Sequence, residues 1–189
     1  MSNQLQHVDT LLSSTVTIAK YLAAERGREQ ATLASFIHQR FDERYVRPFE
    51  RNNKKNGFIM MASSCLMIEA IESFWCGWKK SPTSALVFCQ FFDRVERFAV
   101  LRGRAQEFYK NVRCGILHQG ETTGGWHVRR DLIQLFDQDT LTLDATRFLA
   151  ELSAHLSDYK QTLIASPWND PVWKNFRRKM KSVCENAKA

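Results

Sequence analysis

Apolar residues recur every three or four positions along most of the chain, which is the spacing of amphipathic helices. The pattern predicts such helices over residues 4–24, from about 29 into the 40s, 84–92, 103–118 and 144–163. The stretch 58–78 is apolar on nearly all sides, which is typical of a buried central helix. In the helix over 103–118 the expected inner stripe is Ala105, Phe108, Val112 and Ile116.

Turn-forming residues interrupt this helical pattern at a few places. The polar run 51–57 is expected to form a solvated turn, and 95–102 a connection. Gly120 stands where a helix C-terminal glycine belongs, and Asp144 is expected to cap the helix that follows it.

Between residues 121 and 143 the pattern changes from helical spacing to short alternation. Residues 126–130 and 140–143 alternate enough to predict a small β-hairpin. The one clear boundary is the proline-containing stretch 166–171. We therefore expect a single domain over 1–168 and a basic amphipathic helix over 169–189.

Composition supports a mostly helical globular protein. The chain has 189 residues, 44% of them hydrophobic and 25% charged, which excludes intrinsic disorder and fibrous classes. It has 13 phenylalanines and 5 tryptophans to bury, but only 8 glycines and 4 prolines to make turns. Glu69 and Glu72 interrupt the most apolar stretch, which argues against a membrane span. Residues 1–24 lack the pattern of a signal peptide.

The positive charge is concentrated at the C-terminal end. The formal net charge is +7, and residues 171–189 supply +5 of it, leaving +2 for the remainder. The basic residues of that segment are Lys174, Arg177, Arg178, Lys179, Lys181 and Lys188. Because the rest of the chain is nearly neutral, net charge alone does not indicate a nucleic-acid surface. The basic segment is typical of a solvated helix face.

Cysteine and histidine usage gives no indication of a metal. The five cysteines include no pair with a two-residue gap, and the five histidines are scattered along the chain. No glycine-rich phosphate loop and no Gly-x-Ser-x-Gly sequence is present. We therefore expect reduced thiols in a cytoplasmic protein that works without metal or cofactor.

The densest group of polar and aromatic residues is Phe108–Thr122, in which four residues separate Arg113 from His118. This stretch resembles the HEPN superfamily, whose signature is an arginine, four to six residues, then a histidine. The apolar helix before it, the Gly-Gly-Trp segment after it and the final core helix extend the resemblance over about 30–165. The implied fold is an all-α helical bundle with a small β-hairpin inserted before the last core helix.

The resemblance implies metal-independent endoribonuclease activity. In such chemistry the ribose 2′-OH attacks the adjacent phosphate and leaves a cyclic phosphate on one product. His118 suits the proton transfer, and the guanidinium of Arg113 suits the charge on phosphate oxygens. The implied setting is prokaryotic stress response, toxin action or phage defence. Its implied partners are RNA (tRNA or mRNA) and a cognate antitoxin or regulatory protein.

Other residues near the motif are candidates for secondary roles. Supporting residues are expected to be Glu69, Cys114 and Gln119. Further RNA contacts are expected from Arg104, Lys110, Trp126, Arg129 and Arg130.

The spacing of Arg113 and His118 affects whether they can form a site within one chain. On an ideal helix, side chains five positions apart diverge by about 140°, so Arg113 and His118 are not expected to meet on one substrate atom within one chain. Similar proteins pair two chains around a shared cleft, so a homodimer is favoured. Alternatively, unwinding of the helix near Gly115 would bring the two side chains together within one chain.

Several simpler interpretations stay open. Cys114 follows the motif arginine where nucleases of the family often have a more polar residue, which favours a catalytically inactive module that binds nucleotide, RNA or a protein. Arg113 alternatively only pairs with Glu69 or Glu72, and His118 only caps its helix. A thiol–imidazole pair of Cys114 and His118 is a further alternative. Trp126 is either a packing residue or a base-stacking one.

Overall fold

A computed structural model describes residues 9–50, 56–82 and 84–187. The fold is mostly helical, at 68%, with a small three-stranded sheet inserted before the last two helices. The predicted helical fold with a small β insertion at this place is therefore confirmed. The predicted turn over 51–57 lies largely outside the described residues.

The described residues form two compact units. The first unit comprises residues up to 44, residues 73–80 and residues from 156 onward. The second comprises 45–72 and 81–155. Two long helices, α3 (Gly57–Cys76) and α7 (Ala145–Ala165), contribute residues to both.

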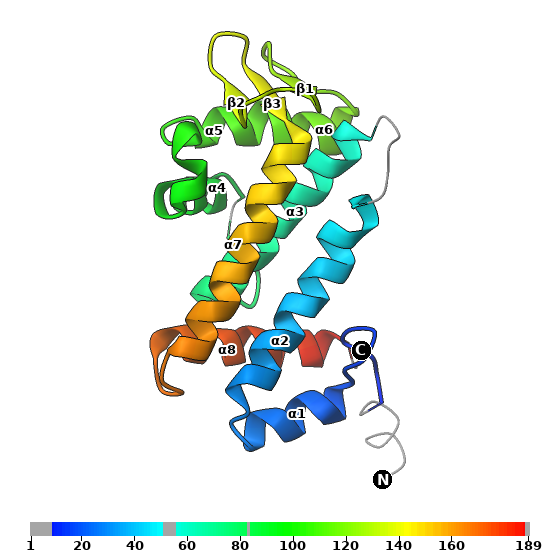
Figure 1. The fold of residues 1–189 in the computed structure, drawn as a ribbon, viewed down its shortest axis with the longest axis vertical. Helices are drawn as coiled ribbons and strands as arrows, with labels where there is room; N and C mark the ends of the chain where they lie inside the picture. The colour runs from blue at the N-terminus through cyan, green and yellow to red at the C-terminus, as the bar shows by residue number, and fades with distance from the viewer. Residues whose placement is uncertain (1–8, 51–55, 83, 188–189) are drawn as a thin grey trace. The chain divides into compact units, whose positions relative to one another are not determined.

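The first unit contains α1 (Ile18–Arg26), α2 (Gln30–Phe41) and α8 (Pro171–Asn186), which are labelled in Figure 1. Aromatic rings form its core. The Tyr21 ring lies 5.9 Å from that of Phe36 and 6.5 Å from that of Phe176, and Phe74 lies 5.8 Å from Phe176. The Asp170 side chain caps α8 by accepting a hydrogen bond from Val172 N–H.

The predicted first helix begins much later than expected. Residues 1–8 lie outside the described part, and 9–16 are not helical. Thr17 caps α1 by accepting a hydrogen bond from Lys20 N–H, and Ser13 Oγ accepts one from Val16 N–H at 3.2 Å. The hydroxyl-rich segment thus satisfies its own backbone in a turn, which competes with helix formation.

The second unit contains α4 (Ser84–Arg94), a 3₁₀ helix η3 (Glu96–Leu101) in place of the expected connection, and most of α3 and α7. Its core is a cluster of fully buried phenylalanines: Phe88, Phe91, Phe92, Phe98, Phe108 and Phe148. Glu72 is buried in the same unit and forms an ion pair with Arg94. Earlier in the chain, directly after α2, lie a π-helical turn η1 (Asp42–Val46) and a 3₁₀ turn η2 (Arg47–Phe49), which contains Pro48.

The helix predicted over 103–118 is divided by a π-helical turn. It consists of α5 (Ala105–Phe108), the π turn η4 (Tyr109–Arg113) and α6 (Cys114–Gln119). Cys114 N–H donates to the carbonyl five residues earlier, at Tyr109. The extra residue in this turn rotates the positions after it, so the predicted inner position Ile116 is only half-buried. Gly120 ends α6 with φ +73°, as predicted.

The β insertion has a different pairing from the predicted hairpin. Strand β1 (His127–Arg129) pairs in parallel with β3 (Thr142–Asp144), and β2 (Phe136–Asp137) pairs antiparallel with β3, giving the order β1-β3-β2. The predicted pairing of 126–130 with 140–143 as a hairpin is therefore wrong, because β2 intervenes and supplies the antiparallel neighbour. The side chain of Asp144 accepts from Arg147 N–H at 2.8 Å, which confirms the predicted cap of α7.

Among the described helices, α3 alone is long and apolar enough to cross a membrane by length and composition. Of its most apolar 18 residues, 56% are buried inside the structure. Such burial is typical of the core helix of a folded domain.

Candidate active site

The side chains of Arg113 and His118 meet within a single chain. Arg113 Nη1 lies 3.5 Å from His118 Nε2, at the surface of the second unit. Arg113 is the last residue of the π turn, and His118 lies in the last turn of α6. The His118 side chain is exposed. A basic group and a titratable group therefore adjoin at a place that solvent reaches.

This contact corrects the expectation drawn from helical spacing. The 140° divergence describes the directions in which the two side chains leave the helix. It does not limit the distance between the far ends of two long side chains. An arginine is long enough to turn along the helix surface, so Arg113 reaches the imidazole in spite of the divergence. The geometric reason for expecting a shared cleft between two chains is thereby removed.

Glu69 holds the guanidinium of Arg113 in place. Arg113 Nε donates to Glu69 Oε1 at 2.9 Å, and Nη2 lies 3.5 Å from Glu69 Oε2. The two side chains are 15% and 16% exposed, so the pair is mostly shielded from water. Burial alone lowers the pKa of Arg113, but the hydrogen bond and negative charge of Glu69 raise it overall. The interpretation that Arg113 pairs with a carboxylate of α3 is confirmed, with Glu69 and not Glu72 as the partner.

Tyr109 is a neighbour of Arg113 that the motif spacing does not indicate. The guanidinium carbon of Arg113 lies 5.7 Å from the centre of the Tyr109 ring, within the range of a cation–π contact. Tyr109 and Arg113 are four positions apart, and this helical spacing is what could have predicted their contact from the sequence. Tyr109 and Glu69 together position the guanidinium.

The chain after His118 folds back against the same helix. Thr123 N–H donates to the carbonyl of Asn111 at 2.9 Å, and Thr123 Oγ1 donates to Asn111 Oδ1 at 3.0 Å. Gly115 permits this approach, because a Cβ at that position would stand 2.5 Å from the Glu121 carbonyl oxygen. The role of Gly115 is therefore close packing and not unwinding of the helix.

The other supporting residues have smaller roles. Cys114 is half-buried, and its thiol interacts with Arg113 in a way that raises the pKa of the guanidinium. Within the described residues no hydrogen bond joins Cys114 to His118, so nothing in the geometry favours a thiol–imidazole pair. Burial raises the pKa of the Cys65 thiol, which lies in the core one turn before Glu69. Gln119 is exposed at the end of α6.

Most of the cations proposed as RNA contacts are bound by neighbouring side chains. Arg104 pairs with Glu107 at 3.1 Å, and Arg129 donates to both oxygens of Asp131 at 2.8 and 2.6 Å. Lys110 is exposed.

Two further candidates are parts of the protein's own framework. Arg130 donates to Asn56 Oδ1 at 2.6 Å and to Thr146 Oγ1 at 3.1 Å. Trp126 is 2% exposed and stacks on Phe136 with ring centres 5.1 Å apart. The packing interpretation of Trp126 is confirmed, and its ring is not available to stack on a base.

The arrangement has the elements of proton transfer beside an anion site. His118 is accessible to a substrate hydroxyl, and Arg113 Nη1, which Glu69 does not engage, lies beside it. Among the residues that the structure describes, no group of three histidine, cysteine or acidic side chains is placed to hold a metal ion. Comparison of the chain with models of protein families, with curated proteins and with solved structures gave no match in any of the three.

Proposed function

We propose that the protein is a metal-independent endoribonuclease in which Arg113 and His118 act together. The observation that carries this proposal is the 3.5 Å separation of Arg113 Nη1 and the exposed His118 Nε2. General acid–base catalysis requires a titratable group that reaches the proton to be moved. A cation fixed beside it meets the second requirement, which is stabilisation of charge that develops on phosphate.

In the proposed reaction, His118 accepts the proton of a ribose 2′-OH as its oxygen attacks the adjacent phosphorus. The bond from phosphorus to the 5′ oxygen of the next nucleotide breaks, and that oxygen takes a proton. The products are a 2′,3′-cyclic phosphate and a free 5′-hydroxyl. Arg113 binds the non-bridging phosphate oxygens from its Nη1 side, which Glu69 does not engage, and a planar guanidinium is geometrically suited to such oxygens.

The proposed setting follows from the resemblance to HEPN proteins. It comprises a cytoplasmic enzyme of stress response, toxin action or phage defence, a tRNA or mRNA substrate, and a cognate antitoxin or regulatory protein. Self-association as a homodimer is part of the same proposal. Leu66 lies one helical turn before Glu69 and Leu117 one turn after Arg113, and these leucines are 44% and 37% exposed. They supply exposed apolar surface on α3 and α6.

A second candidate function is a catalytically inactive module of the same fold that binds RNA, nucleotide or a protein. The observation that favours it is the engagement of Arg113 by Glu69, which offsets the positive charge offered to a phosphate. The weak hydrogen-bonding capacity of the Cys114 thiol points in the same direction.

Incubation of purified protein with tRNA and total RNA in excess EDTA separates the two functions. The enzyme cleaves under these conditions and leaves cyclic-phosphate ends, His118→Ala abolishes cleavage, and Arg113→Lys lowers the rate by about 100-fold or more. His127→Ala is the matched control, because His127 is an exposed histidine on β1 outside the Arg113–His118 pair. Binding without cleavage establishes the inactive module. Cleavage that requires added Mg²⁺ or Mn²⁺ refutes the mechanism.

A further inference from the structure

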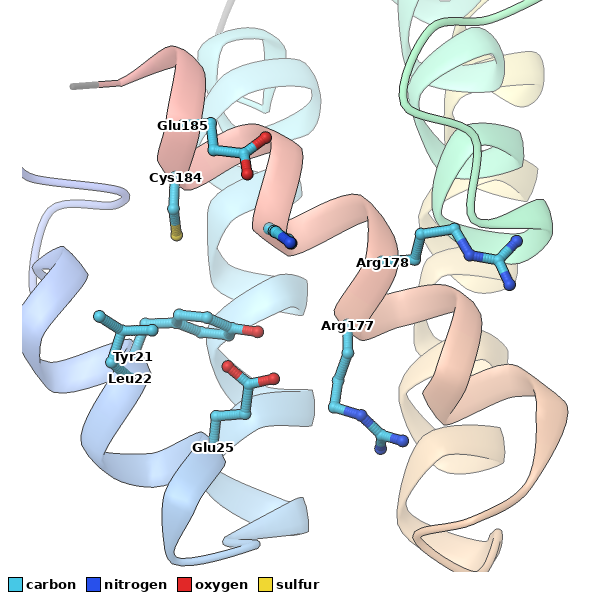
Figure 2. A pocket seen from close by; sticks show the side chains of 8 residues that line it. Tyr21, Leu22, Glu25, Arg177, Arg178, Cys184 and Glu185 are labelled. Atoms are coloured by element: carbon cyan, nitrogen blue, oxygen red, sulfur yellow. The ribbon is translucent and has the colours of Figure 1, made fainter. Parts of the chain in front are cut away.

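A cavity of about 500 Å³ lies between α1 and α8 in the first unit. Figure 2 shows Tyr21 and Glu25 facing it from α1, and the Tyr21 hydroxyl forms a hydrogen bond with Glu25. On α8, the guanidinium carbon of Arg177 lies 4.4 Å from the Trp168 ring centre, and Nη1 donates to the Trp168 carbonyl at 2.9 Å. These polar groups are satisfied by the protein itself, whereas Figure 2 shows the Arg178 side chain extending away from α1.

Arg178 belongs to a row of three cations on the exposed face of α8. Lys174, Arg178 and Lys181 are four and three positions apart, so they lie on one side of the helix over roughly 10 Å. All three side chains are exposed, and none has an ion-pair or hydrogen-bond partner among the described residues. Glu185, one turn further along, is exposed on the same side and ends the row. The row therefore presents three unengaged positive charges in a line.

The loop after α3 adds two exposed cations, Lys79 and Lys80, beside this row. Asn175 Nδ2 of α8 donates to the Trp75 carbonyl at 2.8 Å, and Lys179 Nζ donates to the Lys79 carbonyl at 3.2 Å. Asn175 and Lys179 each directly follow a cation of the row, so the loop is held next to it. The exposed cations of the row and the loop are named the α8 basic surface: Lys79, Lys80, Lys174, Arg178 and Lys181.

The second unit offers few free cations by comparison. Each of its described arginines is engaged by a neighbouring group. Among the lysines and arginines that the structure describes in this unit, Lys110 alone remains. Affinity for nucleic acid comes largely from Lys and Arg side chains that neutralise phosphates. The α8 basic surface meets this requirement better than the arginines near the Arg113–His118 pair.

The two faces of α8 favour a nucleic acid over a membrane or a protein. Trp173, Phe176 and Met180 are fully buried, so α8 has no apolar face left to insert into a bilayer. None of the large apolar side chains in the described range 171–187 is exposed. Protein interfaces have apolar and aromatic centres from which charged residues are depleted. A line of cations without apolar neighbours instead suits a backbone of regularly repeated phosphates.

We propose that the α8 basic surface binds the phosphate backbone of RNA and holds the substrate of the endoribonuclease. This inference rests on the proposed function, since it names the surface that binds the same RNA. It assigns RNA binding to the first unit and RNA cleavage to the second. The contacts are made to phosphates, so they carry affinity and not base specificity.

Fluorescence anisotropy with labelled bulk tRNA tests the surface, in the full chain with His118→Ala so that the RNA stays intact. Added Lys174→Gln/Arg178→Gln/Lys181→Gln should weaken binding at least tenfold. It should also reduce the slope of log affinity against log salt by about 2, because about three phosphate contacts are lost. Lys79→Gln/Lys80→Gln should weaken binding several-fold.

The matched control removes three other exposed cations of the first unit that have no side-chain partner among the described residues: Arg26→Gln, Arg28→Gln and Arg44→Gln. It lowers the net charge equally and should weaken binding less than threefold. Thermal midpoints of all variants should match the parent, because only exposed side chains change.

Equal weakening by the control and the row variant overturns the surface, as does the absence of tRNA binding at 50 mM salt. Competition by polyglutamate as strong as that by unlabelled tRNA assigns the surface to an acidic protein and also overturns it. The cleavage assay on chains with His118 intact separates the two proposals. Row-dependent binding without any cleavage refutes the enzyme and supports the surface. Cleavage with kcat/KM unchanged by the row variant supports the enzyme and refutes the surface.

Discussion

The Glu69 carboxylate binds Arg113 through two nitrogens, Nε at 2.9 Å and Nη2 at 3.5 Å. This pairing joins α3 to the end of the π turn and fixes the plane of the guanidinium. The third nitrogen, Nη1, is left beside His118. A single ion pair therefore both stabilises the second unit and determines how the arginine faces the imidazole.

Replacement of Glu69 by Gln tests both contributions. The amide keeps the size of the side chain but loses the charge and one of the two accepting oxygens. We expect the free energy of unfolding to fall by about 1–2 kcal/mol, because a mostly buried charge-assisted pair is weakened. RNA cleavage should fall as well, since the guanidinium is no longer fixed at two points.

Denaturant unfolding and the cleavage assay measure the two effects of Glu69→Gln. Glu107→Gln is the matched control, because Glu107 pairs with Arg104 in an exposed position, where the stability change should be within about 0.5 kcal/mol. A Glu69→Gln protein as stable as the wild type would show that the pair contributes nothing to folding.

Gly115→Ala is expected to destabilise the second unit by about 1–3 kcal/mol. The new methyl group would stand 2.5 Å from the Glu121 carbonyl oxygen, so the chain after His118 must move away. Gly27→Ala is the control, because there the nearest atom is the flexible end of Glu29 and φ is −72°. Thermal unfolding compares the variants, and equal midpoints would contradict the close-packing role of Gly115.

Mixing Arg113→Ala chains with His118→Ala chains tests where the site is completed. Because Arg113 and His118 meet within one chain, neither variant retains an intact pair, and mixing should not restore cleavage. The control is a mixture of wild-type with His118→Ala chains, which should keep the activity of the wild-type fraction. Partial recovery in the mixed variants would instead establish pairing across two chains.

Self-association is tested separately, by a substitution on the exposed apolar surface of α6. Leu117→Asp introduces a charge into the exposed apolar surface beside the motif. It should shift a dimer toward monomer in sedimentation, while the free energy of unfolding changes by no more than about 0.5 kcal/mol, as is usual for surface substitutions. Ile133→Asp is the control, because Ile133 is 91% exposed and lies outside α6. An unchanged sedimentation profile for Leu117→Asp would exclude this surface from the interface.

Tyr21 should make stability fall at high pH. Burial and Glu25 raise its pKa in the folded state above the ordinary value near 10. Above that ordinary value the unfolded chain releases the phenol proton while the folded chain keeps it. Stability is therefore fully present below about pH 10 and decreases as pH rises further. Denaturant unfolding from pH 8 to 11 should show a smaller decrease for Tyr21→Phe than for the wild type, and parallel curves would contradict this.

Most helices and their ends are predictable from the sequence, because they depend on neighbouring residues. The spacing of apolar positions located α2, α3, α4 and α7, and the ends at Gly120 and Asp144 follow from local backbone and capping chemistry. Arg113 and His118 were also evident as candidate site residues, since both lie in one short segment.

Features that depend on residues distant along the chain are visible only in the folded protein. Periodicity cannot distinguish Glu69 from Glu72 as the partner of Arg113, because both lie on α3 and the choice depends on how that helix packs. The parallel pairing of β1 with β3 and the cavity between α1 and α8 are likewise contacts between distant segments. The meeting of Arg113 with His118 depends on the side-chain conformations that packing selects. An ideal helix specifies only the directions in which side chains begin.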